Sequence, residues 1–213
     1  MAEGLRERKK RQTRQYISDV ATGLFVERGF DAVTVAEIAD AADVSVNTVY
    51  NYFPAKEDLF FDRSGDIGDR LARWVRGRRK GESAADAVLR ELREEAEAVS
   101  PRLGLMPGIA DFMRVVEQAP TLRSRLWAIG QEVQDNLEAA LREETGAADD
   151  DPLPQLIAGQ LGWAHSAVMA VVRREMVKGR DPREVSREVL DLLDDIEELM
   201  GGKVLNYAVR GVE

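Results

Sequence analysis

The spacing of apolar residues predicts a chain built from helices. Between residues 13 and 28 apolar positions recur at intervals of three and four, the period of a helix with one buried face. The same period, with capping residues or prolines at most of its starts, predicts helices at residues 84–99, 102–118, 120–145, 152–178 and 182–200. No segment alternates as a strand does, so the expected fold class is all-α.

Two short helices joined by a tight turn are expected after the first helix. Thr34 followed by Glu37 forms a capping box for the first short helix. Ser45 is placed as the N-cap of the second, which spans residues 46–52. Short helices in this arrangement are typical of a helix-turn-helix, so residues 1–55 are expected to form a three-helix unit of this kind.

The second short helix has an apolar side and a polar side. Val49 and Phe53 are expected to hold it against its neighbours. Its remaining residues carry hydroxyls, amides and aromatic rings: Asn47, Thr48, Tyr50, Asn51 and Tyr52. On an exposed helix this composition suits contacts with phosphates and base edges rather than core packing.

The resemblance to a known family lies in two adjoining stretches. They read L-F-V-E-R-G-F-D-A-V-T-V-A-E-I-A and V-S-V-N-T-V-Y-N-Y-F-P-A-K-E-D-L-F. The segment of roughly residues 12–60 that contains them resembles the DNA-binding domain of the tetracycline-repressor (TetR) family. Asp43 stands in the turn where that family usually has Gly. Because Asp tolerates the left-handed conformation better than most residues, the same turn is expected.

The resemblance implies which residues meet DNA and what the rest of the chain does. The second helix of the motif is expected to enter the major groove, and an all-helical C-terminal domain, residues 56–213, to bind a small ligand and to dimerise. The residues expected to contact DNA are Thr34, Ser45, Asn47, Thr48, Tyr50, Asn51, Tyr52 and Lys56. For Lys56, near the N-terminus of a new helix, the alternative is an ordinary exposed lysine.

Charge is distributed unevenly along the chain. The 213 residues have a formal net charge of −9, but residues 1–14 hold six basic and two acidic side chains, which leaves −13 for the remainder. A basic arm on an acidic body fits a protein that touches nucleic acid at one end. The alternative is that the arm is merely a solvated, disordered terminus.

Several other classes of protein lack support in the sequence. There is no cysteine, so disulfides, thiol chemistry and cysteine-based zinc sites are excluded. No Gly-rich phosphate loop or nucleophile elbow indicates an enzyme, and no cofactor is expected. Because no apolar run is long enough to cross a bilayer and the N-terminus is charged, we expect a cytoplasmic protein with no membrane partner.

The last two long helices are expected to form a homodimer interface. Residues 152–178 are apolar in nearly every direction around the helix axis, whereas residues 182–200 have one apolar stripe and an acidic opposite face. A helix that is apolar all round must be buried on all sides, so this pair is expected to pack against its copy as a four-helix interface. The alternative is a central helix in a monomeric bundle.

An apolar effector pocket is expected among the middle helices. The break at Pro107–Gly108 interrupts a segment rich in methionine and aromatic residues, which are side chains suited to an apolar pocket. The candidates are Met106, Ile109, Phe112, Met113, Val116, Trp127, Trp163, His165 and Met169. For each of them plain core packing is the alternative. His165 is the only histidine and gives no support for a metal site; it is either a core residue or a polar anchor.

The reading that combines these features is a ligand-responsive repressor. A homodimer would bind a palindromic DNA operator and leave it when a small, largely apolar effector enters the C-terminal domain. A helix beginning at Lys56 and running past Gly65 and Gly68 to Val75 would connect the two domains. The alternatives are a DNA-binding regulator that answers to a partner protein or to no ligand, and a helical ligand-binding protein that has lost DNA binding.

Overall fold

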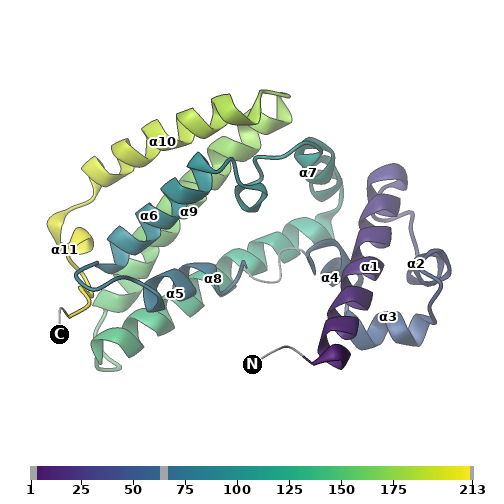
Figure 1. Cartoon of the computed structure of the whole chain (residues 1–213), viewed down its shortest axis with the longest axis horizontal. Helices are drawn as coiled ribbons and strands as arrows, with labels where there is room; N and C mark the ends of the chain where they lie inside the picture. Colours follow the sequence, from purple (N-terminus) through teal and green to yellow (C-terminus); the bar gives the residue numbers. More distant parts are fainter. Residues whose placement is uncertain (1–3, 63–66, 212–213) are drawn as a thin grey trace. The chain divides into compact units, whose positions relative to one another are not determined.

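The computed structural model describes residues 4–62 and 67–211, and every regular element in these ranges is a helix (Figure 1). This confirms the expected all-α class. In chain order the elements are α1 (Leu5–Arg28), α2 (Val35–Ala41), α3 (Val46–Tyr52), α4 (Lys56–Phe60), α5 (Arg70–Arg76), α6 (Ala84–Glu97), the 3-10 helix η2 (Pro101–Leu103), α7 (Ile109–Gln118), α8 (Pro120–Thr145), α9 (Leu153–Val177), α10 (Pro182–Leu199) and α11 (Gly202–Leu205). None of the helices described is long and apolar enough to cross a bilayer.

Contacts within the chain divide it into two units. Unit 1 consists of residues 1–66 and 114–127, and unit 2 consists of residues 67–113 and 128–213. Unit 1 therefore extends beyond residue 55, where the sequence suggested a boundary, because α4 packs against α1. It also includes the second part of α7 and the first part of α8.

Aromatic side chains form the centre of unit 1. The ring centroids of Phe25 and Phe30 lie 4.8 Å apart, and those of Phe25 and Phe60 lie 5.9 Å apart. The hydroxyl of Ser18 donates a hydrogen bond to the carbonyl of Leu59 at 3.0 Å. Large buried rings supply much of the apolar area that so small a unit can bury, so α1 and α4 are held together by this cluster.

The first helix is longer than its apolar pattern predicts. It begins at Leu5, well before the expected start at residue 13. Residues 5–12 contain neither Gly nor Pro and are mostly Arg, Lys and Glu, which have high helix propensity. The basic residues expected to form an N-terminal arm are therefore the first turns of α1.

Two of the longer helices predicted from the sequence are divided in the structure. The expected connector from Lys56 consists of the separate helices α4 and α5; Gly65 lies outside the described residues, and Gly68 precedes α5. Residues 102–118 form η2 and α7 instead of one helix. Gly104 and Gly108 have φ angles of 83° and 85°, which glycine adopts without steric cost and which end a right-handed helix.

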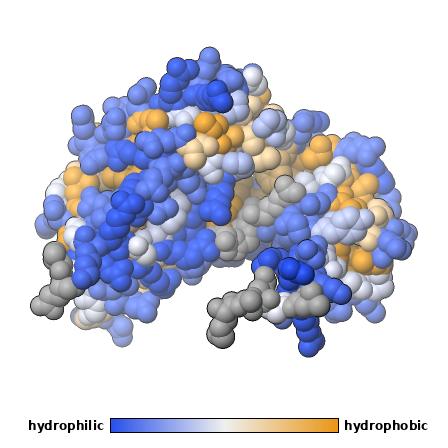
Figure 2. Space-filling model, in the orientation of Figure 1, coloured by the Kyte–Doolittle hydropathy of each residue, from blue (hydrophilic) through white to orange (hydrophobic). Residues whose placement is uncertain are grey.

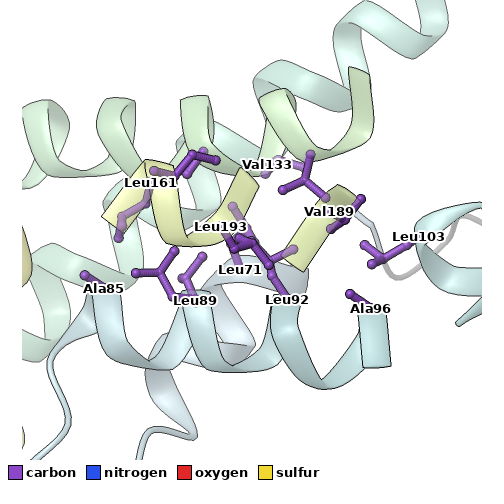
Figure 3. Close-up of a cluster of buried hydrophobic side chains, with 14 of the residues drawn as sticks. Leu71, Ala85, Leu89, Leu92, Ala96, Leu103, Val133, Leu161, Val189 and Leu193 are labelled. Carbon is purple, nitrogen blue, oxygen red and sulfur yellow. The ribbon is translucent and has the colours of Figure 1, made fainter. Parts of the chain in front are cut away.

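The core of unit 2 is formed by buried residues of α5, α6, α8, α9 and α10. Leu89 and Leu92 of α6 are buried together with apolar residues of α9 and α10 (Figure 3). The hydroxyl of Ser186, on α10, donates to the carbonyl of Ala96, at the end of α6, at 2.6 Å. Because α6 and α10 are each apolar on one face only, both faces turn toward this core and their charged sides meet water.

Helix α9 is buried along one side and exposed along the other. Its buried residues are Pro154, Ile157, Ala158, Leu161, Ala164, His165, Val168, Val172, Glu175 and Met176. On the exposed side, Leu153, Leu156 and Trp163 are spaced by three and seven residues, and Val177 lies further along. Within the chain, therefore, only one side of α9 is buried, and the apolar residues of its other side remain exposed.

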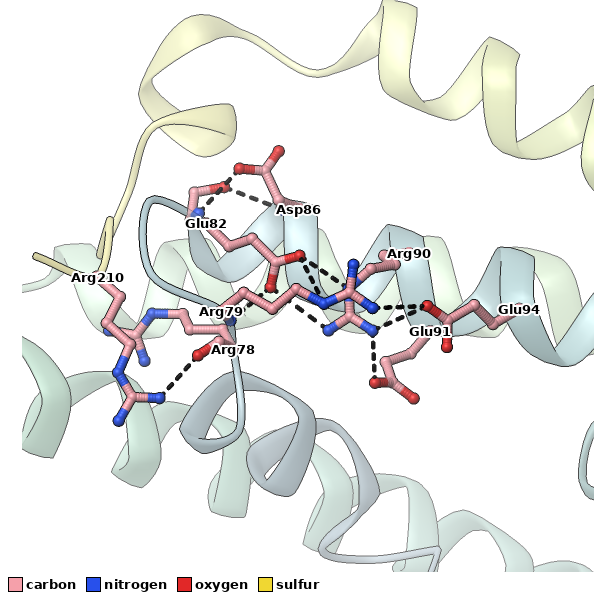
Figure 4. A network of polar contacts seen from close by, with 9 residues as sticks. Arg78, Arg79, Glu82, Asp86, Arg90, Glu91, Glu94 and Arg210 are labelled. Carbon is pink, nitrogen blue, oxygen red and sulfur yellow. Dashed lines mark hydrogen bonds and ion pairs between the residues drawn. The ribbon is translucent and has the colours of Figure 1, made fainter. Parts of the chain in front are cut away.

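Most of the surface shown in Figure 2 is hydrophilic, with smaller groups of hydrophobic residues between the charged ones. Arg90, on α6, takes part in a network of charged side chains that includes Glu82, Glu91 and Glu94 (Figure 4). A groove of about 500 Å³ beside these residues is lined mainly by charged side chains. Carboxylates outnumber arginines in its lining, which holds five acidic side chains and only Arg90 and Arg93 as basic ones, so the groove is acidic.

Arg78 joins three segments of unit 2. Its side chain is 3% exposed. Its Nε donates to the carbonyl of Ala208 at 2.8 Å, and its Nη1 donates to the carbonyl of Val75 at 2.7 Å and to Glu144 Oε2 at 2.5 Å. Arg210 Nη1 in turn donates to the carbonyl of Arg78 at 2.7 Å. The C-terminal segment is thereby bound to the end of α5 and to α8.

We expect Arg78→Met to lower the free energy of unfolding by about 3 kcal/mol, because it removes one partner of a buried ion pair and the side-chain donor to the carbonyl of Ala208. Urea denaturation of the purified protein measures this. The matched control is Arg76→Met, since Arg76 makes ion pairs at 3.3 and 3.5 Å but is largely exposed, and such pairs contribute about 0 to 1 kcal/mol. Equal losses in the two variants would contradict this account.

Candidate nucleic-acid interface

The N-terminus of α2 is fixed by a capping box and an ion pair. The Thr34 side chain accepts a hydrogen bond from the Glu37 N–H at 3.2 Å, and Glu37 Oε2 accepts from the Thr34 N–H at 2.7 Å. Arg28, at the end of α1, donates to Glu37 Oε1 at 2.6 Å. The capping box expected from the sequence is confirmed, and the ion pair of Arg28 with Glu37 attaches the end of α1 to the start of α2.

The turn between α2 and α3 has the left-handed conformation expected at Asp43. Its φ angle is 52°. The Val44 N–H donates to the carbonyl of Ala39 at 3.0 Å, which closes the end of α2. Asp is among the residues that accept this conformation at modest cost, so the turn forms without Gly.

Helix α3 is held at its start by a cap and on its inner side by two buried residues. Ser45 Oγ accepts a hydrogen bond from the Thr48 N–H at 3.0 Å and lies 2.8 Å from the Thr48 hydroxyl. Val49 and Phe53 are each only 1% exposed. With these anchors in place, the opposite side of α3 faces away from the core of unit 1.

The outward side of α3 carries polar side chains in a row. Asn47, Tyr50 and Asn51 are spaced by three and four residues, so they share one face. All three are exposed, and Tyr50 is 50% exposed. Within the described part of the chain the side chains of these three residues make no hydrogen bond to the rest of the protein, so their amides and hydroxyl are available to an outside partner.

Tyr52 and Lys56 lie at the edge of this surface and are engaged with the protein. The carbonyl of Tyr52 accepts a hydrogen bond from Arg14 Nη1 at 2.8 Å. Lys56 Nζ donates to the carbonyl of Phe30 at 2.6 Å and lies 4.3 Å from the centroid of that ring. Burial lowers the pKa of Lys56. Lys56 thus supports the turn that follows α1, a role that the sequence did not indicate.

Arg14 is a second residue whose role the sequence did not show. In the sequence it is only one of the six basic residues among residues 1–14. In the structure its Nε donates to Asp62 Oδ1 at 2.6 Å, and its guanidinium lies 4.6 Å from the centroid of the Phe53 ring. It therefore helps to hold the C-terminal end of α3. Its partners lie far away along the chain, so no local pattern could have indicated them.

The expected effector residues are spread over both units. Val116 and Trp127 belong to unit 1, and the others belong to unit 2. Those that are buried are Met113, Val116 and His165; those that are half-buried are Met106, Ile109, Phe112 and Met169; and those that are exposed are Trp127, at 70%, and Trp163, at 48%. Within unit 2, Ile109 and Met169 both pack against the same apolar core.

Metal binding has no support in the described ranges, residues 4–62 and 67–211. Within them no three His, Asp or Glu side chains lie close enough together to hold an ion. The groove beside α6 contains none of the expected effector residues.

Comparison with known sequences finds transcriptional regulators that are similar to this chain, one of them over most of its length. A family model described as bacterial regulatory proteins, tetR family, matches residues 17–62. The transcriptional regulator TcmR of Streptomyces glaucescens is 30% identical over 181 residues, which cover 81% of this chain and 76% of that protein. The transcriptional repressor KstR of Mycobacterium tuberculosis is 39% identical over 70 residues, 33% of this chain and 30% of that protein.

Solved structures share the fold. NalD, described as the secondary repressor of the MexAB-OprM multidrug efflux pump in Pseudomonas aeruginosa, aligns with a TM-score of 0.55 and 19% identity over 87% of this chain and 96% of its own. A SmeT–triclosan complex aligns with a TM-score of 0.55 and 20% identity over 91% of this chain and 97% of its own. At these identities the likeness concerns the fold alone.

We expect the stability that Glu37 contributes to depend on pH. Its hydrogen bond with Arg28, followed by those with Thr34, lowers the pKa of Glu37 from 4.5 to about 2. A carboxyl whose pKa is lowered by folding stabilises the folded state at every pH above its ordinary pKa. This stabilisation is lost as the pH falls from about 4.5 toward 2. The urea midpoint of Glu37→Gln should lie below that of the unsubstituted protein at pH 7 and approach it near pH 3.

Arg28→Gln serves as the partner control for this experiment. In protein that carries Arg28→Gln, the additional change Glu37→Gln should lower the urea midpoint by less at pH 7. The reason is that Arg28 is the largest cause of the lowered pKa of Glu37. A gap between the unsubstituted protein and Glu37→Gln that stays constant down to pH 2 would show that the ion pair does not act through the charge of Glu37.

Proposed function

Because this chain belongs to the tetR family of bacterial regulatory proteins, and is accordingly a transcriptional regulator rather than an enzyme, we propose that it is a homodimeric repressor of a palindromic operator. A small, largely apolar effector would release it from DNA. The observation that carries the proposal is the outward face of α3, where exposed polar side chains stand on a helix anchored from behind by Val49 and Phe53.

The proposed contacts follow from the position of each side chain on α3. Asn47, Tyr50 and Asn51 have exposed hydrogen-bonding groups and would read base edges, with Thr48 at base or phosphate. Thr34 and Ser45 are N-caps, and Tyr52 lies at the rim. From there they would meet phosphates, because exposed hydroxyls and amides at helix starts are common phosphate ligands. Lys56 would add its charge nearby while keeping its bond to Phe30.

The proposed dimer interface consists of α9 and α10. The exposed side of α9 carries Leu153, Leu156 and Trp163, and α10 ends with an exposed leucine, Leu199. Two copies packed through these faces would form four helices and bury on the order of 2,000 Å². A dimer is also what a palindromic operator requires, since its two half-sites lie about one helical turn, 34 to 36 Å, apart.

The proposed form of control is repression, with release from DNA when the effector binds. The relative KstR is named as a repressor. An effector changes the equilibrium only if it prefers the conformation that does not fit the operator, so its site should belong to unit 2, where the interface helices also lie. The expected effector residues of unit 2, Ile109 and Met169 among them, border its apolar core.

We expect Asn47→Ala and Tyr50→Phe to weaken binding to the DNA flanking the protein's own gene about 10- to 100-fold each, since a lost base contact is worth about 1 to 3 kcal/mol. Gel shifts at a fixed salt concentration measure this, because nonspecific binding changes steeply with salt. The control is Asp40→Ala on the exposed side of α2. If the unsubstituted protein forms no specific band, the operator proposal fails.

We expect Trp163→Glu to convert the dimer to a monomer, because it would bury charges at the centre of the proposed interface. Analytical ultracentrifugation measures the mass, and circular dichroism checks that the variant is folded. Trp127→Glu is the matched control, since Trp127 is even more exposed but belongs to unit 1. A dimer that survives Trp163→Glu, or dissociates in Trp127→Glu, would place the interface elsewhere.

A further inference from the structure

The side of α9 that faces away from the core of unit 2 carries one row of side chains. Five residues at intervals of seven, four, three and four share this face: Leu156, Trp163, Ala167, Ala170 and Arg174. Leu156, Trp163 and Arg174 are exposed, and the two alanines are half-buried. The row is therefore apolar along most of its length and ends in a cation.

The neighbouring helix α10 carries a carboxylate beside this row. Helices α9 and α10 pack side by side and run in opposite directions (Figure 1). Asp195 lies three residues after Leu192 and four before the exposed Leu199, so it shares their face. Asp194 turns toward α6 and pairs with Arg93 at 2.9 Å. Within the part of the chain that the structure describes, the carboxylate of Asp195 makes no hydrogen bond or ion pair and is open to an outside cation.

The pair formed by α9 and α10 is positive at one end and negative toward the other. Residues 173–188, around the turn that joins the two helices, hold six basic and four acidic side chains, whereas residues 189–200 hold five acidic side chains and no basic one. Arg174 pairs with Glu175 at 2.6 Å, but Lys178 and Arg180 also pair with that carboxylate, at 3.0 and 3.4 Å. Because Glu175 is shared among three cations, each end of the pair is complementary to the opposite end of a second copy.

Trp163 and Asp195 stand at the same height on their two helices. The turn lies between Val177, where α9 ends, and Pro182, where α10 begins. Since a helix rises about 1.5 Å per residue, Trp163 and Asp195 are each roughly 24 Å from the turn, whereas Arg174 is roughly 8 Å from it. Arg174 therefore cannot reach Asp195 of its own chain.

Two-fold symmetry allows α9 to face its copy in two directions. An axis along the helices would place each Arg174 at the height of the other Arg174 and far from either carboxylate of Asp195, so that like charges repel. An axis across the helices reverses the second copy. If it crosses α9 midway between Trp163 and Arg174, each Arg174 comes to the height of the partner's Trp163 and Asp195. Ala167 and Ala170 lie at this crossing, where small side chains let the two helices approach closely.

We propose that two copies of this chain pack through α9 in opposite directions, with Arg174 of each copy held between Trp163 and Asp195 of the other. The inference rests on the proposed function for the existence of a homodimer, and it adds the direction, the axis and the pairs. The guanidinium forms an ion pair with the partner's Asp195 and lies over the ring of the partner's Trp163, a face on which arginine binds well. Arg174 thereby gains a carboxylate of its own as the interface excludes water, which a buried cation requires.

The absence of cysteine makes the direction of packing testable by cross-linking, because a single introduced cysteine can form a disulfide only with its copy. We expect oxidised Ala170→Cys to run as a covalent dimer on a non-reducing gel, since a disulfide requires Cα atoms within about 7 Å. Leu156→Cys is the matched control on the same face. In the proposed arrangement its copies lie about 40 Å apart along the helices, so it should stay uncross-linked. Cross-linking at both positions, at neither, or at Leu156→Cys alone would refute the arrangement.

Charge reversal tests the pairs themselves. Arg174→Glu and Asp195→Arg should each weaken the dimer at least tenfold, because each places like charges together at two points of the interface. An equimolar mixture of the two variants should regain the dimer, since in the mixed pair of chains both contacts again join opposite charges. Pairing within one chain cannot produce this rescue. Sedimentation velocity measures the dimer fraction of each variant and of the mixture.

Asp194→Arg is the matched control for Asp195→Arg, since it makes the same change one residue away on the side that pairs with α6, where the Asp194 side chain is 72% exposed. It should leave the dimer intact and give no rescue of Arg174→Glu. Single variants that stay dimeric, or a mixture that dimerises no better than its components, would overturn the proposed pairs. A dimeric unsubstituted protein that fails these tests refutes this arrangement alone, whereas a monomeric one refutes the homodimer itself.

Discussion

The burial of Val49 and Phe53 is the constraint on which the proposed DNA-facing surface depends. Helix α3 has only seven residues, and an isolated helix of that length is not stable in water. Two anchors on its inner side, a serine cap at its start and Arg14 near its end supply what the backbone alone cannot. The exposed amides and hydroxyls are therefore presented in a fixed register, although none of them contributes to the core.

Local signals predicted much of the structure. The capping box at Thr34, the left-handed Asp43 and the cap at Ser45 act within a few residues, so the sequence alone indicated them. The start of α8 at Pro120 and its end before Gly146 were recognised in the same way. What escaped prediction depends on distant partners: Lys56 bonded to Phe30, and the division of contacts between the two units, which depends on packing and not on sequence order.

Unit 2 combines a firm core with places that are not optimised for stability. Arg78 and Ser186 are buried polar residues whose hydrogen bonds are all made within the chain, and they tie its segments together. In residues 4–62 and 67–211, Glu95 Oε2 and His165 Nε2 are buried as well but make no hydrogen bond, although Glu95 Oε2 lies 3.8 Å from Arg70 Nη1. Such positions fit the proposed control by a ligand, because an interior in which every polar atom is hydrogen-bonded leaves a ligand no new bond to form.

The start of α1 at Leu5 changes how many of the N-terminal cations can act together. On a helix successive residues are turned by about 100°, so Arg6, Lys9 and Lys10 project to one side while Arg8 and Arg11 project to the opposite side. A rigid rod cannot turn both sides to one polyanion, as a flexible arm could. If this end of the molecule binds DNA, only about half of these cations could contact phosphates and release counterions.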